Sequence, residues 1–206
     1  MASDLITLLE GAALTKFIGP AAEHYGKAAL ERAQHLGAAA YRYLANVGRE
    51  AAPVAPNVLV PLVQAAALEI DETLAAKWAA LLANAADPEK QIAVTASYVE
   101  VLRQLSSIDA QVLEHLYTKA RPDDRSILDW EQAPVYTQEF PAALQLSPTQ
   151  VSLSVETLLR LRLCTPSTYK NSKFDGGLSP IPSPTFKVCP TVFGYEFLRA
   201  CMPPLV

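Results

Sequence analysis

The residues that could perform acid–base or metal chemistry are few and widely separated in this chain. The three histidines, His24, His35 and His115, lack the H-E-x-x-H or C-x-x-C neighbours that a metal centre requires. His24 and His35 could share one face of a helix, but no acidic residue completes a site with them. Their pattern is typical of histidines on the flanks of helices, and it predicts no catalytic or metal-binding role.

An acidic cluster is the second candidate for chemistry. Asp123 and Asp124 are followed by Asp129 and Glu131, and carboxylates at this spacing could hold a divalent cation of the kind that nucleases use. The same residues are also typical of a solvated loop that runs into an edge strand, and we favour that interpretation. A toxin-like, metal-dependent nuclease built on Asp123, Asp124 and Asp129 is the second alternative function.

Other motifs for catalysis or cofactor binding are absent from the sequence. It contains no G-x-x-x-x-G-K-[ST] or G-x-G-x-x-G run to cradle a phosphate, and no G-x-S-x-G nucleophile elbow. The three cysteines, Cys164, Cys189 and Cys201, lack C-x-x-C spacing, which indicates reduced core thiols rather than disulfides or a zinc site. We expect no catalytic residue, no cofactor and no metal, and therefore a protein that is not an enzyme.

Composition and charge limit the class of protein further. A chain of 206 residues that is 50% hydrophobic can bury one substantial core or two modest ones. Its formal net charge of −4 gives no global attraction for nucleic acid. Charged residues from Lys16 to Arg32 interrupt every long apolar run near the start, so we expect neither a signal peptide nor a membrane span. These features predict a cytoplasmic protein.

Helical spacing dominates the first half of the chain. One or two helices are predicted between residues 3 and 48, because apolar residues recur on one face there: Leu30, Ala33, Leu36, Ala40 and Leu44. The prolines of segment 52–56 should end this region. A further helix should begin at Asp71 and Glu72 and end before Pro88. Its predicted buried face, anchored by Trp78, consists of Ile70, Leu74, Trp78, Leu81, Leu82 and Ala85.

Capping signals predict the helices that follow. Ser97 and Ser106 each precede an acidic residue by three positions, so two short helices should open at these serines. Ser147, Pro148 and Gln150 combine the strongest start signals in the chain and predict a helix over residues 148–163.

The last hundred residues are predicted to form a winged helix. A short helix at 137–144 would precede helix 148–163 in a helix-turn-helix layout. Two short strands at 164–169 and 185–189 would flank a wing. The closing run Thr191, Gly194 and Phe197 matches the T-x-x-G-x-x-F tail helix that often follows such a wing. The predicted fold is mainly α, with a helical N-terminal part (1–104) and a winged-helix-like α+β C-terminal part (105–206).

The segment 54–116 carries a family resemblance. The acidic run Glu69-Ile70-Asp71-Glu72 precedes a W-A-x-L-L-A-N-A sequence that begins at Trp78 and includes Asn84. This series resembles the Abi-alpha family, an abortive-infection-associated bacterial domain of otherwise unknown function, and the wing and tail fit it more loosely. The resemblance implies a context in phage defence and a set of family motif residues: Glu69, Asp71, Glu72, Trp78, Asn84, Thr191, Gly194 and Phe197. Helix capping could explain Glu69 and Asn84 without any site, and we favour that explanation.

A winged helix would also suit a DNA-binding transcriptional regulator, which is the first alternative function. Helix 148–163 would enter a major groove with Thr149, Gln150 and Ser152 at its front, and a wing with Lys170, Lys173 and Lys187 would reach phosphates. This basic cluster is thin, and the front of the helix lacks the Arg or Lys that most often reads guanine. DNA is therefore not the favoured partner.

The same helix is rich in apolar side chains: Val151, Leu153, Val155, Leu158, Leu159 and Leu161. They offer more apolar surface than one small core should cover, which favours protein contacts. Because cyclic dimers are the commonest soluble oligomers, we expect a homo-oligomer. The leading hypothesis is a non-enzymatic phage-defence protein that acts through an unidentified protein partner.

Overall fold

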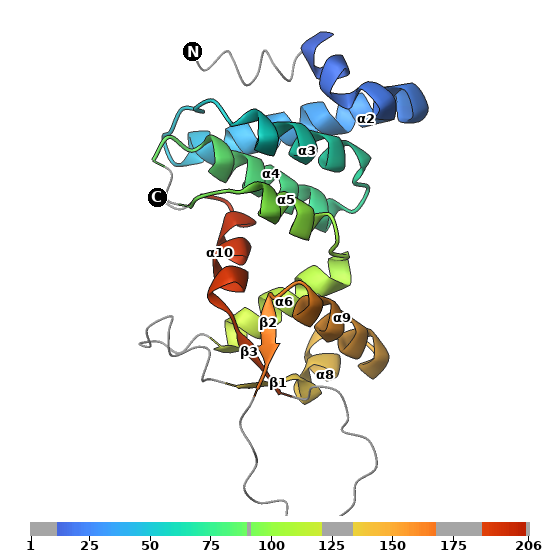
Figure 1. Ribbon diagram of the computed structural model, residues 1–206, viewed down its shortest axis with the longest axis vertical. Coiled ribbons are helices and arrows are strands. Elements are labelled where there is room, and N and C mark those ends of the chain that lie inside the picture. Colours follow the sequence, from blue (N-terminus) through green and yellow to red (C-terminus); the bar gives the residue numbers. More distant parts are fainter. Residues whose placement is uncertain (1–11, 90–91, 121–133, 168–186, 205–206) are drawn as a thin grey trace, which may run out of the picture. The chain divides into compact units, whose positions relative to one another are not determined.

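The computed structural model of the chain describes residues 12–89, 92–120, 134–167 and 187–204, and for residues 12–26 it describes the backbone alone. These residues are mainly helical, and a small antiparallel sheet of three strands lies in the C-terminal part (Figure 1). The prediction of a mainly α fold with an α+β C-terminal part is confirmed. No helix among the described residues is both long and apolar enough to cross a membrane.

The chain divides into two compact units. Unit 1 comprises Met1–Gln104 and Arg199–Val206, and unit 2 comprises Leu105–Leu198. The described helices of unit 1 are α2 (Ala12–Asn46), α3 (Pro56–Leu68), α4 (Glu72–Ala86) and α5 (Ala96–Leu102). Helix α2 packs against both α3 and α4, and α3 also contacts α5 (Figure 1). The predicted stripe of α2 is buried at Ala33, Leu36, Ala40 and Leu44, whereas Leu30 is half-buried.

Helix α3 begins at the end of the predicted proline-rich hinge and occupies a segment for which the sequence predicted no element. It begins at Pro56, at a position where the missing N–H of proline costs no helical hydrogen bond. Its apolar residues Val58, Leu59, Leu62 and Val63 are buried. Helix α2 ends before the hinge, at Asn46, and Gly48 with a φ of 71° forms its C-cap: the N–H groups of Gly48 and Arg49 bond the carbonyls of Ala45 and Leu44. Of the hinge prolines, Pro56 starts the next helix.

Helix α4 begins and ends as predicted. The Asp71 carboxylate accepts a hydrogen bond from the backbone N–H of Leu74 at 3.0 Å, and the helix ends before Asp87 and Pro88. Trp78 is 1% exposed, in agreement with its predicted anchor role.

Two residues of the predicted buried face of α4 do not belong to it. Ile70 precedes the helix and is 83% exposed, and Ala85 is half-buried. The reason for the exposure of Ile70 is local: Oε1 of Glu69 accepts the backbone N–H groups of Ile70 and Asp71, each at 3.0 Å, and so shapes a turn in place of a further helical residue.

One of the two predicted short capping boxes is confirmed. The Asp109 carboxylate accepts from Ser106 N at 2.9 Å, and Ser106 Oγ accepts from Asp109 N at 3.2 Å. The box at Ser97 is wrong, because Thr95 takes the N-cap position with an extended backbone and Ser97 lies inside α5.

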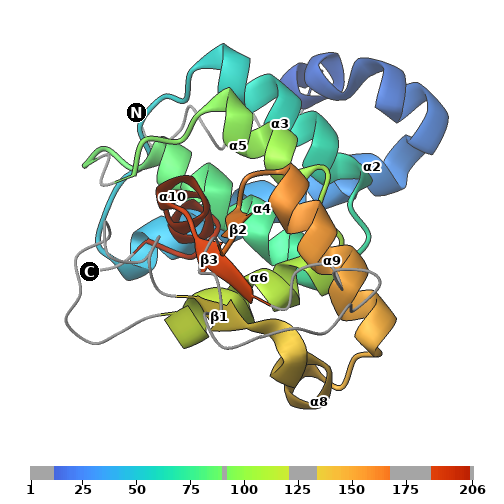
Figure 2. The same cartoon turned by 60° about the horizontal axis from the view of Figure 1, so that its bottom comes forward.

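Unit 2 packs helices against the small sheet. Its described elements are α6 (Ser107–Ala120), β1 (Val135–Tyr136), the 3-10 helix η1 (Thr137–Glu139), α8 (Phe140–Leu144), α9 (Pro148–Arg160), β2 (Cys164–Pro166), β3 (Lys187–Pro190) and most of α10 (Val192–Ala200). Strand β3 lies between β1 and β2 and is antiparallel to both (Figure 2). Helix α6 contacts α8, α9 and β3, and α9 also contacts β2.

Helix α9 opens as predicted but ends earlier. Ser147 and Gln150 form a reciprocal capping box. The helix ends at Arg160 rather than at residue 163, because Arg162 adopts a left-handed φ of 58°. The N–H groups of Arg162 and Leu163 then bond the carbonyls of Leu159 and Leu158, the pattern of a Schellman cap.

The apolar surface of α9 is smaller than the sequence suggested. Val151, Val155 and Leu158 are buried and Leu153 is 60% exposed. Leu159 and Leu161 are half-buried. The core of unit 2 thus covers more of this helix than we expected.

Candidate functional site

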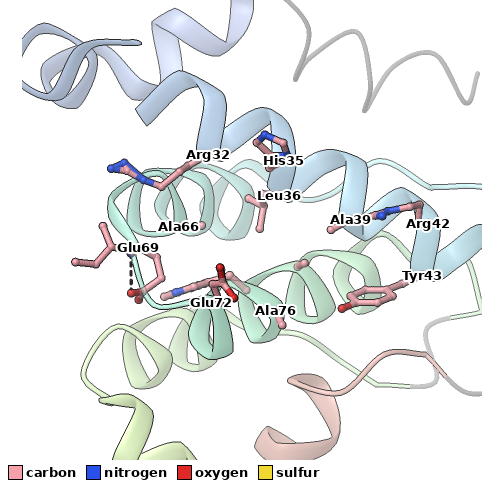
Figure 3. A pocket seen from close by; sticks show the side chains of 14 residues that line it. Arg32, His35, Leu36, Ala39, Arg42, Tyr43, Ala66, Glu69, Glu72 and Ala76 are labelled. Carbon is pink, nitrogen blue, oxygen red and sulfur yellow. Dashed lines mark hydrogen bonds between the residues drawn. The ribbon is translucent and has the colours of Figure 1, made fainter. Parts of the chain in front are cut away.

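A pocket of about 620 Å³ lies within unit 1 (Figure 3). Helix α2 forms one wall, and the end of α3, the turn that follows it and the first half of α4 form the other. Its lining residues are Arg32, His35, Leu36, Ala39, Arg42, Tyr43, Ala66, Glu69, Ile70, Glu72, Ala75, Ala76, Trp78 and Ala79. Three of the predicted family motif residues, Glu69, Glu72 and Trp78, therefore line one pocket.

The two walls of the pocket carry opposite charges. Arg32 and Arg42 project from α2, and Glu69 and Glu72 project from the turn and the start of α4 (Figure 3). In this view Arg32 and Glu69 lie toward one end of the pocket, and Arg42 lies toward the other. None of the ion pairs among the described residues joins these side chains. The pocket thus holds charges of both signs that are not neutralised by direct pairing.

Two hydrogen-bond donors in the pocket lining are buried without an acceptor in the described part of the chain. They are Nε1 of Trp78 and Nη1 of Arg32. Trp78 is almost fully buried, whereas Arg32 as a whole is half-buried. Buried donors in native proteins nearly always have a partner, so these two atoms require an explanation.

Sequence reasoning missed the basic wall. Arg32, His35 and Arg42 were not singled out together, although their spacing places them on one face of α2. That spacing was the only signal in the sequence for a basic wall. It was not sufficient, because charged residues on one face of a helix usually contact solvent.

Asn84 serves the structure rather than the pocket. Its Nδ2 donates to the carbonyls of Ala80, Ala200 and Met202, at 3.1, 3.0 and 2.7 Å. It is 4% exposed. Asn84 therefore ties the C-terminal residues of unit 1 to α4, and the predicted capping role was too local.

The tail motif belongs to a second network in unit 2. Tyr117 Oη donates to the carbonyls of Leu163 and Thr191 at 2.7 and 3.0 Å, and it accepts from Thr191 N at 3.0 Å. Oγ1 of Thr191 caps α10 by accepting from Gly194 N at 3.0 Å. A Cβ at Gly194 would collide with Tyr117 Oη and the Leu163 carbonyl. Phe197 is 1% exposed, so the whole motif has a packing role.

The two histidines whose side chains the structure describes lie in different units. His35 lines the pocket, whereas the ring of His115 meets Phe140 edge-on in unit 2, with 4.7 Å between centroids. Burial lowers the pKa of His115, and nearby Lys119 lowers it further. Asp123, Asp124, Asp129 and the side chain of His24 lie outside the described residues. Among the residues that are described, no group of three or more His, Cys, Asp or Glu is placed to hold a metal ion.

The three cysteines are buried and form no disulfide, as predicted. Burial, together with a smaller effect of nearby Cys189, raises the pKa of the Cys164 thiol to about 12. A thiol with this pKa is a weak nucleophile at neutral pH, which suits a core residue.

The candidate DNA contacts are only partly described. Thr149 and Gln150 are exposed and Ser152 is half-buried. Lys187 is half-buried, and its ammonium group lies 4.8 Å from the centroid of the Tyr136 ring. Lys170 and Lys173 lie outside the described residues.

Comparison with known proteins gives one match. The model of a family described as Abortive infection alpha matches residues 31–201, which is most of the chain and includes both motif regions. No curated protein and no solved structure matches the chain. On the strength of the family match, and in agreement with the resemblance of its Glu69 to Asn84 segment, this chain belongs to the abortive infection alpha family.

Proposed function

We propose that this chain takes part in abortive infection by binding another protein, rather than by catalysis. The contact surface that we propose is the Ile70 turn, residues 68–72, between α3 and α4. Family membership supports the defence context, and the exposure of Ile70 supports the binding role.

The Ile70 turn holds apolar side chains in solvent. Ile70 is 83% exposed and Leu68 is 44% exposed. Two side chains fix the backbone of the turn. Oε1 of Glu69 accepts two backbone N–H groups, and the carboxylate of Asp71 caps α4. A single exposed aliphatic residue is common on protein surfaces. Ile70 differs because it lies in a turn that hydrogen bonds hold in one conformation, within the acidic run of the family. Burial of a fully exposed Ile side chain contributes about 1.5–3 kcal/mol to the free energy of binding. Preorganisation of the turn lowers the conformational entropy that binding costs.

Charge indicates the kind of partner. Three carboxylates flank Ile70 in sequence: Glu69, Asp71 and Glu72. A complementary protein surface would have an apolar socket for Ile70 with Lys or Arg around it, and such charges speed association and suppress wrong partners.

A photo-crosslinking amino acid at position 70 tests the contact in cells before and after phage infection. We expect one discrete crosslinked protein species, and a matched probe at the exposed α2 residue Gln34 should not yield it. A crosslink to a second copy of the chain would identify self-association as the contact. Absence of any discrete species at position 70 would contradict the proposal.

A plaque assay tests whether the contact matters for defence. Ile70→Asp should lose protection against a phage that the wild-type chain restricts, with an unchanged melting temperature. Leu153→Asp is the matched control, because Leu153 is 60% exposed in unit 2 and outside the proposed surface. Full protection by Ile70→Asp would show that the turn is not the functional surface.

A further inference from the structure

We infer that the pocket of unit 1 binds a peptide end that combines a free carboxylate with a cationic group. This inference rests on the proposed function, because the tail of a protein partner is one source of such a group. A free short peptide is the other source. Both present the same chemistry to the pocket.

The buried donors call for an anion. Nε1 of Trp78 and Nη1 of Arg32 can only donate hydrogen bonds, and neither has an acceptor in the described part of the chain. An occupant that satisfies both must bring acceptor oxygens. A carboxylate offers two acceptor oxygens. Its hydrogen bond to the Arg32 guanidinium would be charge-assisted and therefore stronger than a bond between neutral groups.

The opposite wall calls for a positive group. Glu69 and Glu72 line the same pocket and form no ion pair among the described residues. They would repel a bare anion in a partly desolvated pocket, and they would attract an ammonium or guanidinium group. The pocket is therefore complementary to a ligand that carries both charges.

The rest of the lining suits a short peptide. Both walls carry small side chains, which would allow the backbone of a bound peptide to approach closely. These side chains are Ala39, Ala66, Ala75, Ala76 and Ala79. A volume of about 620 Å³ falls within the usual range for ligand pockets.

Isothermal titration calorimetry with the full chain tests the inference. The probe is an equimolar library of Lys-X-X tripeptides with free termini, compared with the same library as C-terminal amides. We expect the acids to bind and the amides to bind about tenfold more weakly or worse, since a charge-assisted hydrogen bond is lost. No binding of the acids, or equal binding of acids and amides, would overturn the inference.

N-acetylated acids separate the two sources. These peptides keep the lysine side chain but lose the terminal ammonium group. Retained affinity would indicate that the pocket takes a protein tail, whereas loss of affinity on acetylation would indicate a free peptide.

Variants locate the site. Arg32→Gln and Glu72→Gln should each weaken binding of the acids by about tenfold, while Arg103→Gln should not, because the Arg103 side chain pairs with Glu100 on α5 outside the pocket. Unchanged binding by both pocket variants would also overturn the inference. In Trp130→Phe the only remaining tryptophan is Trp78, so its fluorescence should change on binding.

The outcome is separable from that of the proposed function. Leu68→Asp alters the Ile70 turn at an exposed residue outside the pocket lining, so it should lose phage protection and still bind the tripeptides. Loss of phage protection with intact peptide binding would place the functional contact at the turn alone. Tripeptide binding without any effect of Ile70→Asp on protection would support the pocket and contradict the proposed function.

Discussion

The hydroxyl group of Tyr117 occupies the space that a side chain at position 194 would need. Tyr117 lies in α6 and Gly194 lies in the first turn of α10. The hydroxyl also bonds the carbonyls of Leu163 and Thr191, so it joins the end of α9 to the start of α10. Gly194 is thus required by packing, and the T-x-x-G run of the family is explained without a ligand.

Gly194→Ala should destabilise the full chain. The added Cβ meets both Tyr117 Oη and the backbone carbonyl of Leu163, and the latter has little room to move. Overpacking of this kind costs about 1–3 kcal/mol. Urea denaturation measures the loss, and Tyr117→Phe provides the control because removal of the hydroxyl should make Gly194→Ala less costly. An unchanged midpoint in Gly194→Ala would contradict the packing explanation.

Alkaline pH should weaken the contribution of Tyr117 to stability. Burial raises the pKa of Tyr117 from 10.0 to about 12. Above pH 10 the unfolded chain releases the phenol proton while the folded chain retains it, so the contribution is complete below pH 10 and is lost as the pH rises to about 12. The free energies of unfolding of wild type and Tyr117→Phe should therefore converge over this window. A constant difference would show that the phenol titrates normally.

Local hydrogen bonding explains which elements were predictable from sequence. The helix starts at Asp71, Ser106 and Ser147 were all predicted, and at each one the side chain accepts from a backbone N–H three positions later. Ile70 was assigned wrongly because helical periodicity continues into the turn that precedes α4, and periodicity alone does not mark where a helix begins.

Long-range contacts explain what the sequence could not reveal. Tyr117 bonds a residue 74 positions away, and no pattern in either segment announces that contact. The pocket likewise joins Arg32 on α2 to Glu69 and Trp78, which follow α3 in the chain. The acidic wall was visible as a motif, but its basic counterpart became apparent only when the helices were packed together.

Asn84→Ala should loosen the C-terminal residues of unit 1. The side chain donates to three carbonyls, two of which belong to Ala200 and Met202. Leaving buried carbonyls without donors costs about 1–3 kcal/mol. Limited proteolysis near the C-terminus and the melting temperature measure the effect, and the exposed Asn57→Ala is the matched control. Equal protease resistance of Asn84→Ala and wild type would refute the role of Asn84.

Trp78→Ala should be among the most destabilising substitutions in unit 1. The side chain is 1% exposed, and removal of a packed large aromatic costs about 3–5 kcal/mol. Trp78→Phe should cost clearly less, because it keeps an aromatic ring and removes an indole N–H that has no acceptor among the described residues. Chemical denaturation compares the two. A similar loss in both variants would mean that the indole N–H contributes to stability and has a partner.

Duplex DNA should bind weakly, if at all. Two of the six candidate contacts have intramolecular partners: Gln150 accepts from Ser147 N at 2.9 Å, and Lys187 stands over the ring of Tyr136. The front of α9 contains no Arg or Lys, the residues that most often read guanine. We therefore expect binding that does not depend on sequence.

The salt dependence makes this expectation quantitative. The cations of the proposed wing and of the end of α9 are Arg160, Arg162, Lys170, Lys173 and Lys187. Even if each neutralised one phosphate, a slope of about −0.9 per contact gives a logarithmic salt slope no steeper than about −4.5. The net charge of −4 opposes association further.

Fluorescence anisotropy with random and genomic duplexes at about 150 mM salt, the physiological ionic strength, should show no stable complex. A nanomolar, sequence-selective complex under these conditions would instead establish a DNA-binding regulator, and the proposal of a protein partner would have to give way.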